Sequence, residues 1–130
     1  MAYLSVDMGL KRIGLAYSPD GKTAVAIAPI IRKNRVQASG DLRRIIAEKK
    51  IDRLVVGLPI GYKSEEDMKR RIDHFLKLLN TDIPVHFQDE TDSSKEAAEF
   101  IKDKKDGRID SIAALIILER FLRSEKSTMA

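Results

Sequence analysis

The sequence predicts an α/β protein with one mixed sheet flanked by helices, and three observations lead to this prediction. The first 31 residues carry three short strand patterns joined by tight links. After them, helix and strand patterns alternate to the end of the chain. The length of 130 residues suits one domain with a buried core, so we expect residues 1–130 to fold as one unit.

Residues 3–7, 12–18 and 23–31 are the three predicted strands at the start of the chain. The link SPDGK at 18–22 places Pro, Asp and Gly in the order typical of a turn. The link DMGLK at 7–11 is equally short, which favours a hairpin over a crossover connection. The three strands should therefore form an antiparallel meander.

Helix and strand patterns alternate in the rest of the chain. The first predicted helix has its N-cap at Ser39 or Asp41 and ends near Lys50. Strands are expected at 52–59 and 83–88. Further helices are expected to begin at Ser64, Ser93 and Asp110. Such alternation implies two parallel strands, and after a three-stranded meander it is the layout of the ribonuclease H-like fold, with the first and fourth strands side by side.

Composition narrows the classes of function. The chain has 24 Lys or Arg against 20 Asp or Glu, so its formal net charge is +4. It has no cysteine, which excludes disulfides, thiolate metal sites and cysteine nucleophiles. Asp7 interrupts the apolar run that a signal peptide needs, and no stretch is long and apolar enough to span a membrane. We therefore expect a soluble, cytoplasmic protein without a membrane partner.

Acidic residues lie at the ends of several predicted elements: Asp7 after the first strand, Asp89 and Glu90 after the fifth, and Asp110 at the start of the last helix. If the first, fourth and fifth strands are parallel, their carboxyl ends share one end of the sheet, where ligands bind in open α/β proteins. The last helix is apolar for two turns and must pack on the sheet. Three or four carboxylates should therefore converge.

A cluster of like charges is unfavourable unless cations neutralise it. Oxygen ligands at strand ends suit Mg²⁺ or Mn²⁺, and two such ions can activate water for phosphodiester cleavage. The alternative for each acid alone is a turn, cap or solvated loop residue. A further alternative is the phosphate loop of actin-like ATPases, because Gly9 follows a strand-end Asp7. Those enzymes close two such domains over a nucleotide, whereas this chain has the length of one.

Basic residues lie near the proposed carboxylates and elsewhere. Five of them flank the acids and are expected to contact nucleic-acid phosphates: Lys11, Arg12, Lys104, Lys105 and Arg108. The other basic stretches, at 32–35, 43–44 and 69–71, are interpreted as solvated faces. The expected partner is a nucleic acid. The residues leave RNA and branched DNA open as substrates, and a monomer and a homodimer as assemblies.

Four blocks of the sequence resemble the YqgF family, also known as pre-16S rRNA nucleases or Holliday junction resolvase homologues. The blocks are VDMGLKRIGLA at 6–16, VVGLPIG at 55–61, FQDETDSSKEAAEF at 87–100 and RIDSIAALIILERFL at 108–122. The likeness runs from Leu4 to about Leu122. It implies a ribonuclease H-like fold related to that of the RuvC resolvases, and a role in trimming the precursor of small-subunit ribosomal RNA.

The resemblance also implies site residues, with Asp7, Glu90 and Asp110 as catalytic residues and ligands of Mg²⁺ or Mn²⁺. Cleavage would leave a 5′-phosphate and a 3′-hydroxyl. The family's Asp-Glu-Arg block ends here in Thr91, and the missing arginine weakens the hold on phosphate more than on metal. Three function classes remain, in this order: a metal-dependent nuclease, a non-catalytic RNA-binding ribosome-assembly factor, and a nucleotide-binding ATPase module.

Overall fold

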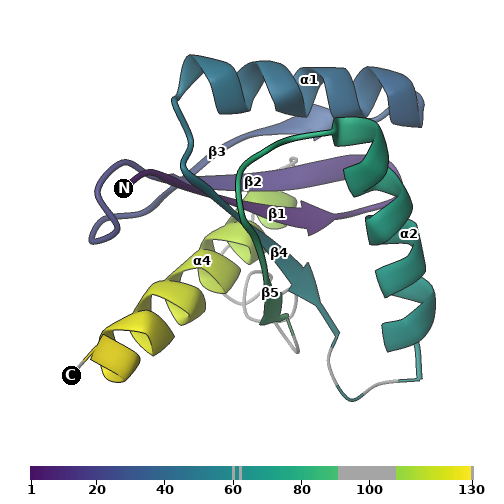
Figure 1. The fold of residues 1–130 in the computed structure, drawn as a ribbon. Helices are drawn as coiled ribbons and strands as arrows, with labels where there is room; N and C mark the ends of the chain where they lie inside the picture. The colour runs from purple at the N-terminus through teal and green to yellow at the C-terminus, as the bar shows by residue number, and fades with distance from the viewer. Residues whose placement is uncertain (60, 62, 91–107, 130) are drawn as a thin grey trace.

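The computed structural model describes residues 1–59, 61, 63–90 and 108–129, with the backbone alone for 108–110 and 125–129. Its elements, labelled as in Figure 1, are β1 (Tyr3–Met8), β2 (Arg12–Ser18), β3 (Val25–Ile31), α1 (Arg35–Glu48), β4 (Arg53–Leu58), α2 (Glu65–Leu79), β5 (Val85–Asp89) and α4 (Arg108–Met129). This order agrees with the predicted order of strands and helices. The helix expected to begin at Ser93 lies outside the described residues.

The five strands form one sheet in the order β3-β2-β1-β4-β5. β1 pairs antiparallel with β2, and β2 pairs antiparallel with β3. On the other side, β1 pairs parallel with β4, and β4 pairs parallel with β5. The predicted meander, the two parallel strands and the adjacency of the first and fourth strands are all confirmed. The fold is therefore α/β with the ribonuclease H-like arrangement, and β1 is its central strand.

One end of the sheet collects the carboxyl ends of the parallel strands. It is formed by the last residues of β1, β4 and β5: Met8, Leu58 and Asp89. β3 also ends there, because Met8 pairs with Ile13 across β1 and β2, and Arg12 pairs with Ile31 across β2 and β3. We call this the carboxyl end of the sheet. The segments that follow four of the strands therefore leave the sheet at the same place.

Helices cover both faces of the sheet, with α1 and α2 on one face and α4 on the other (Figure 1). Side chains alternate between these faces along β1, as they do in any strand. Leu4 and Val6 belong to the core beneath α1 and α2, whereas Tyr3 belongs to the core beneath α4. The Ser5 hydroxyl also faces α4, where it donates a hydrogen bond of 2.6 Å to the carbonyl oxygen of Ala114.

α4 buries one side against β1, β2, β3 and β4, and its buried side chains are Ser111, Ala113, Ala114, Ile117, Leu118, Phe121 and Leu122. Glu119 and Arg123 are exposed on the opposite side. The sheet thus covers the apolar stretch that the sequence pattern placed in this helix. Of the helices in the described part of the chain, none has the length and apolar character needed to cross a membrane.

The start of α1 differs from the prediction, and the expected N-cap at Ser39 or Asp41 is wrong. The helix begins at Arg35, and the Asn34 side chain accepts a hydrogen bond of 2.8 Å from the backbone N–H of Gln37. Gln37 in turn accepts from the backbone N–H of Asn34, which completes a capping box. The N-cap therefore lies five to seven residues before the predicted one, because the prediction rested on the apolar stripe of Leu42, Ile45 and Ile46 and the capping box precedes that stripe.

We predict that Leu54→Ala lowers the free energy of unfolding by about 2–5 kcal/mol, because Leu54 is fully buried in β4 and its loss leaves a cavity. Urea denaturation measures the change. The matched control is Leu10→Ala, since Leu10 is 75% exposed and its truncation should change stability by less than about 0.5 kcal/mol. Equal effects at the two positions would contradict the assigned core.

Candidate functional site

Asp7 and Glu90 lie on the α4 face of the sheet, at its carboxyl end. Asp7 follows Ser5 by two positions in β1, so the alternation of the strand places both side chains on the same face. Glu90 follows directly after β5, and its backbone N–H donates a hydrogen bond of 3.0 Å to the carbonyl oxygen of Leu58. This bond extends the pairing of β4 and β5 by one residue and fixes the position of Glu90.

A glycine in β4 makes room for the Glu90 side chain. A Cβ atom built at Gly57 would lie 2.7 Å from Oε2 of Glu90 and 2.6 Å from Cδ1 of Ile117 in α4. Both distances are shorter than real contacts of a Cβ atom. The Glu90 carboxyl therefore lies over the backbone of β4, in the space between the sheet and α4. Gly57, the first glycine of the VVGLPIG block, leaves space for this approach, and with a Cβ atom there the ends of the Glu90 and Ile117 side chains would have to move.

The Glu90 carboxyl shares a side-chain hydrogen bond with Asp7. Burial raises the pKa of Glu90 above its ordinary value; the hydrogen bond with Asp7 opposes this shift, and the charge of Asp89 adds to it. Two carboxyl groups in contact retain a proton between them or attract a cation, because both cannot carry a bare negative charge at that distance without a large cost. The sequence placed both Asp89 and Glu90 after the fifth strand; in the structure Asp89 is the last residue of β5, and Glu90, directly after it, contacts Asp7.

α4 begins beside these acids. Ser111 is anchored to the meander, because its hydroxyl donates a hydrogen bond of 2.6 Å to the carbonyl oxygen of Ile27 and accepts one of 3.5 Å from the backbone N–H of Leu15. Leu15 is the neighbour of Gly14, which pairs directly with Asp7. Asp110 precedes Ser111 in the first turn of α4, which these bonds hold against β2 and β3. The structure describes no side chain for Asp110.

Two of the three predicted metal ligands, Asp7 and Glu90, have side chains that the structure describes, and both are of the type that binds divalent cations. Asp7 and Glu90 offer carboxylate oxygens alone, which are the donors that Mg²⁺ and Mn²⁺ prefer. Among the side chains that the structure describes, no group of three or more His, Asp or Glu is gathered closely enough to hold a metal ion. The proposed third ligand, Asp110, stays a prediction.

The structure describes the side chains of only some of the basic residues that were predicted to contact phosphate. Lys11 and Arg12 are exposed at the turn between β1 and β2, at the carboxyl end of the sheet. The turn is tight, because a Cβ atom on Gly9 would collide with the carbonyl oxygen of Arg12. Lys104 and Lys105 lie outside the described residues, and Arg108 is placed by its backbone as the first residue of α4.

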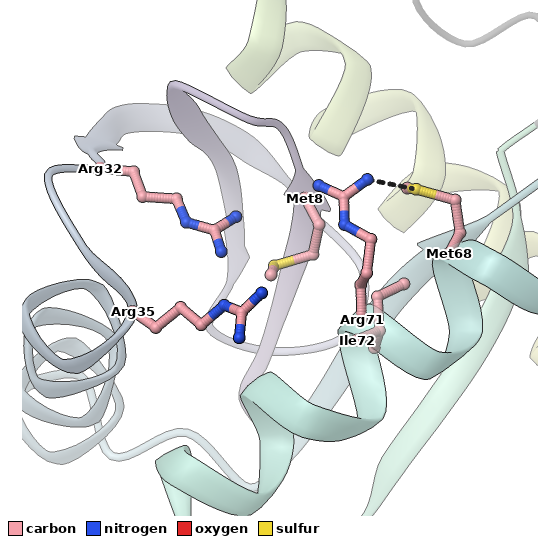
Figure 2. Close-up of a pocket in the computed structure, with 6 residues that line it drawn as sticks. All are labelled: Met8, Arg32, Arg35, Met68, Arg71 and Ile72. Carbon is pink, nitrogen blue, oxygen red and sulfur yellow. Dashed lines mark hydrogen bonds between the residues drawn. The ribbon is translucent and has the colours of Figure 1, made fainter.

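Three arginines that the sequence analysis treated as solvated come together on the other face of the sheet. Arg32, Arg35 and Arg71 line one small pocket, shown in Figure 2. Sequence reasoning missed this cluster, because the three residues belong to separate segments that meet only in the fold. One feature of the sequence could have indicated it. α1 begins with Arg35 and has no acid in its first turn, although the helix dipole favours acids there, so the charge of Arg35 is unfavourable without an anion.

Comparison with known sequences gives consistent matches over nearly the whole chain. A family model described as "RuvX: Holliday junction resolvase" matches residues 1–124. A protein of Sulfurovum sp. (strain NBC37-1) named "Putative pre-16S rRNA nuclease" is 52% identical over 126 residues, covering 94% of this chain and 98% of that protein. A protein of Sulfurimonas denitrificans with the same name is 43% identical over 129 residues, covering 96% and 99%.

Comparison with solved structures gives the same fold. The crystal structure of the fowlpox virus Holliday junction resolvase superimposes with a TM-score of 0.58 at 17% identity, covering 95% of this chain and 99% of that one. RuvC of T. thermophilus, in complex with a Holliday junction substrate, also gives a TM-score of 0.58, at 12% identity and with 98% and 97% covered. Identities this low establish the shared fold alone.

We predict that Gly57→Ala destabilises the protein by about 1–3 kcal/mol, because the added methyl group overpacks the space between β4 and α4. It should also displace the Glu90 carboxyl from Asp7. Chemical denaturation gives the stability change. Gly40→Ala is the matched control: no atom lies within 4 Å of a Cβ built there, and alanine favours a helix by about 0.5–1 kcal/mol. Destabilisation of both variants to the same extent would contradict the assigned contact.

The raised pKa of Glu90 predicts a pH dependence of stability. The folded state keeps a proton that the unfolded state loses above the ordinary pKa of 4.5. The free energy of unfolding of the metal-free protein should therefore fall as pH rises from about 4.5 through the raised value. Denaturation in EDTA across this range should show the fall in the wild type and a smaller one in Glu90→Gln. The exposed Glu66→Gln serves as control, and a wild-type pH profile in Glu90→Gln would contradict the shift.

Proposed function

Since the chain belongs to the RuvX/YqgF family of nucleases, we propose that it hydrolyses phosphodiester bonds with the help of divalent cations. The observation that carries this proposal is the contact between the Asp7 and Glu90 carboxyl groups at the carboxyl end of the sheet. A half-buried carboxyl pair of this kind favours a cation over two free charges. The ligand-binding position of open α/β sheets lies at the same end.

We assign Asp7, Glu90 and Asp110 as the residues that hold Mg²⁺ or Mn²⁺. Asp7 lies on the central strand, with Glu90 on one side and the first turn of α4 on the other, so it is the residue best placed to act with both. When bound, the cation supplies the positive charge that activates water and stabilises the leaving oxygen. No side-chain nucleophile is required, and the products carry a 5′-phosphate and a 3′-hydroxyl.

The chain's own basic residues orient the substrate in this proposal. Lys11 and Arg12 are exposed at the turn that follows Asp7, where they can draw a phosphate toward the acids. Arg108 starts α4 on the same side, and Lys104 and Lys105 precede it in the sequence. These residues would contribute affinity that depends on salt rather than on base sequence.

We propose the precursor of 16S ribosomal RNA as the substrate, because the relatives at 52% and 43% identity are named for that activity. Branched DNA is the second candidate. The family model is described as that of a Holliday junction resolvase, and the similar RuvC structure contains such a junction. A third outcome is a protein that binds the precursor without cutting it and serves in ribosome assembly.

Asp7→Asn should lower the rate of cleavage of a labelled 16S precursor in Mn²⁺ by about 100-fold or more, because it weakens the hold on the cation. The fold should be retained, since the side chain keeps its size and the repulsion with Glu90 falls. RNA binding in EDTA should change little, as the basic residues are intact. A gel assay of cleavage and a filter-binding assay measure the two effects.

The matched control is Asp82→Asn, because Asp82 is exposed and precedes β5 at the opposite end of the sheet. It should cut at the wild-type rate. An Asp7→Asn protein that also cuts at that rate would contradict the proposed site. A wild-type protein that binds the precursor in Mn²⁺ without cutting it would favour the role in ribosome assembly. A wild-type protein that cuts a four-way DNA junction but not the precursor would favour the resolvase function.

A further inference from the structure

A cluster of three arginines lies at the carboxyl end of the sheet, on the face covered by α1 and α2. Arg32 follows β3, Arg35 is the first residue of α1, and Arg71 lies in α2. Their side chains line a pocket completed by Met8, Met68 and Ile72. Figure 2 shows the guanidinium groups of Arg32 and Arg35 extending toward Met8, with that of Arg71 on its other side.

The three guanidinium groups are not neutralised by the described part of the chain. Nη1 of Arg32 donates a hydrogen bond of 3.2 Å to the carbonyl oxygen of Gly9, and that of Arg71 donates one of 3.7 Å to the sulfur of Met68. No described carboxylate pairs with Arg32, Arg35 or Arg71. The acids Asp41 and Asp67, on the same two helices, pair instead with Arg44 at 3.2 Å and Arg70 at 2.7 Å.

We expect repulsion within this arrangement to lower the stability of the free protein. Partial burial lowers the pKa of Arg32 from its ordinary range, and the charges of Arg71 and Arg35 lower it further. Like charges that are held together without a counterion repel one another, and the repulsion is stronger where water is partly excluded. A bound anion would remove this repulsion. The unneutralised charge therefore points to an anionic ligand.

We propose that the cluster formed by Arg32, Arg35 and Arg71 binds a phosphate of the nucleic-acid backbone, separate from the phosphodiester that is cut. Guanidinium groups match phosphate oxygens with paired hydrogen bonds. The cavity volume is about 10 Å³, room for about one water-sized group such as a phosphate oxygen. No aromatic side chain lines the pocket, so the contact is with the backbone and is independent of base sequence.

The position of the cluster relates it to the proposed cleavage site. Met8 lines the pocket and is the next residue after Asp7, but its side chain lies on the opposite face of β1. A strand that presents one phosphate to Asp7 could therefore cross the end of β1 and present another to the arginines. The choice of a nucleic acid as the source of the phosphate rests on the proposed function, whereas the preference for an anion rests on the cluster itself.

The test compares two double variants that remove the same charge from the same two helices. Arg35→Gln with Arg71→Gln removes two members of the cluster and leaves Arg32 bonded to Gly9. Arg44→Gln with Arg70→Gln removes two exposed arginines that already pair with acids. Binding of a short single-stranded RNA is measured by fluorescence anisotropy in EDTA, so that cleavage does not interfere. The salt dependence of the Kd is measured for each protein.

The cluster variant should raise the Kd by about tenfold or more and reduce the slope of log affinity against log salt by about 0.7, the value for one phosphate contact. The control variant should change the Kd much less. In the absence of RNA, the cluster variant should melt at the same or a higher temperature than the wild type, since repulsion is removed. The single Arg35→Gln variant repeats the test if the double variant does not fold, because Arg35 is exposed.

Equal losses of affinity in the two double variants would overturn the proposal, because net charge alone would then explain binding. Competition by inorganic phosphate or 5′-AMP at the same concentrations as the RNA phosphates would also overturn it, in favour of a site for small anions. If the cluster variant binds RNA weakly while the wild type fails to cut in Mn²⁺, this inference stands and the proposed nuclease function fails. If the wild type cuts but the cluster variant binds RNA with the wild-type Kd, the proposed nuclease function stands and this inference fails.

Discussion

The site depends on the close approach of two carboxyl groups, those of Asp7 and Glu90, at the carboxyl end of the sheet. Three features of the fold produce this approach. The parallel pairing of β1, β4 and β5 places the ends of the strands together, and Gly57 leaves space for the Glu90 side chain. α4 then covers this space, with Cδ1 of Ile117 next to Gly57. The resulting burial raises the pKa of Glu90, and in the function that we propose the pair binds a cation.

The sheet also separates charges that would otherwise neutralise one another. Asp7 and Met8 are neighbours in β1, but strand alternation sends Asp7 toward α4 and Met8 toward α1 and α2. The carboxyl pair therefore lies on one face, and the cluster of Arg32, Arg35 and Arg71 lies on the other. A salt bridge between the two groups would remove the reason for either to bind a ligand. In the account that we propose, this separation allows cations to bind on one face and a phosphate on the other, at the same end of one sheet.

Much of this arrangement follows from local sequence. Strand-end acids and short links were enough to predict the meander, the parallel pairing and the meeting of Asp7 with an acid after the fifth strand, because these depend on periodicity and connection length. The start of α1 was missed, since the capping box of Asn34 and Gln37 lies outside the apolar stripe. The arginine cluster was missed for another reason: its members come from three segments, and their proximity depends on how α1 and α2 pack. The role of Asp110 stays a prediction.

The central claim is that Asp7 and Glu90 form a site for a divalent cation, and thermal unfolding in Mn²⁺ tests it without requiring a substrate. At about 100 times the Kd, a ligand that binds only the folded state adds about 2.7 kcal/mol to the free energy of unfolding. The account predicts a clear rise in the Tm of the wild type and of Asp82→Asn, and a much smaller rise in Asp7→Asn and Glu90→Gln. No rise in the wild type, or an equal rise in all four proteins, would contradict it.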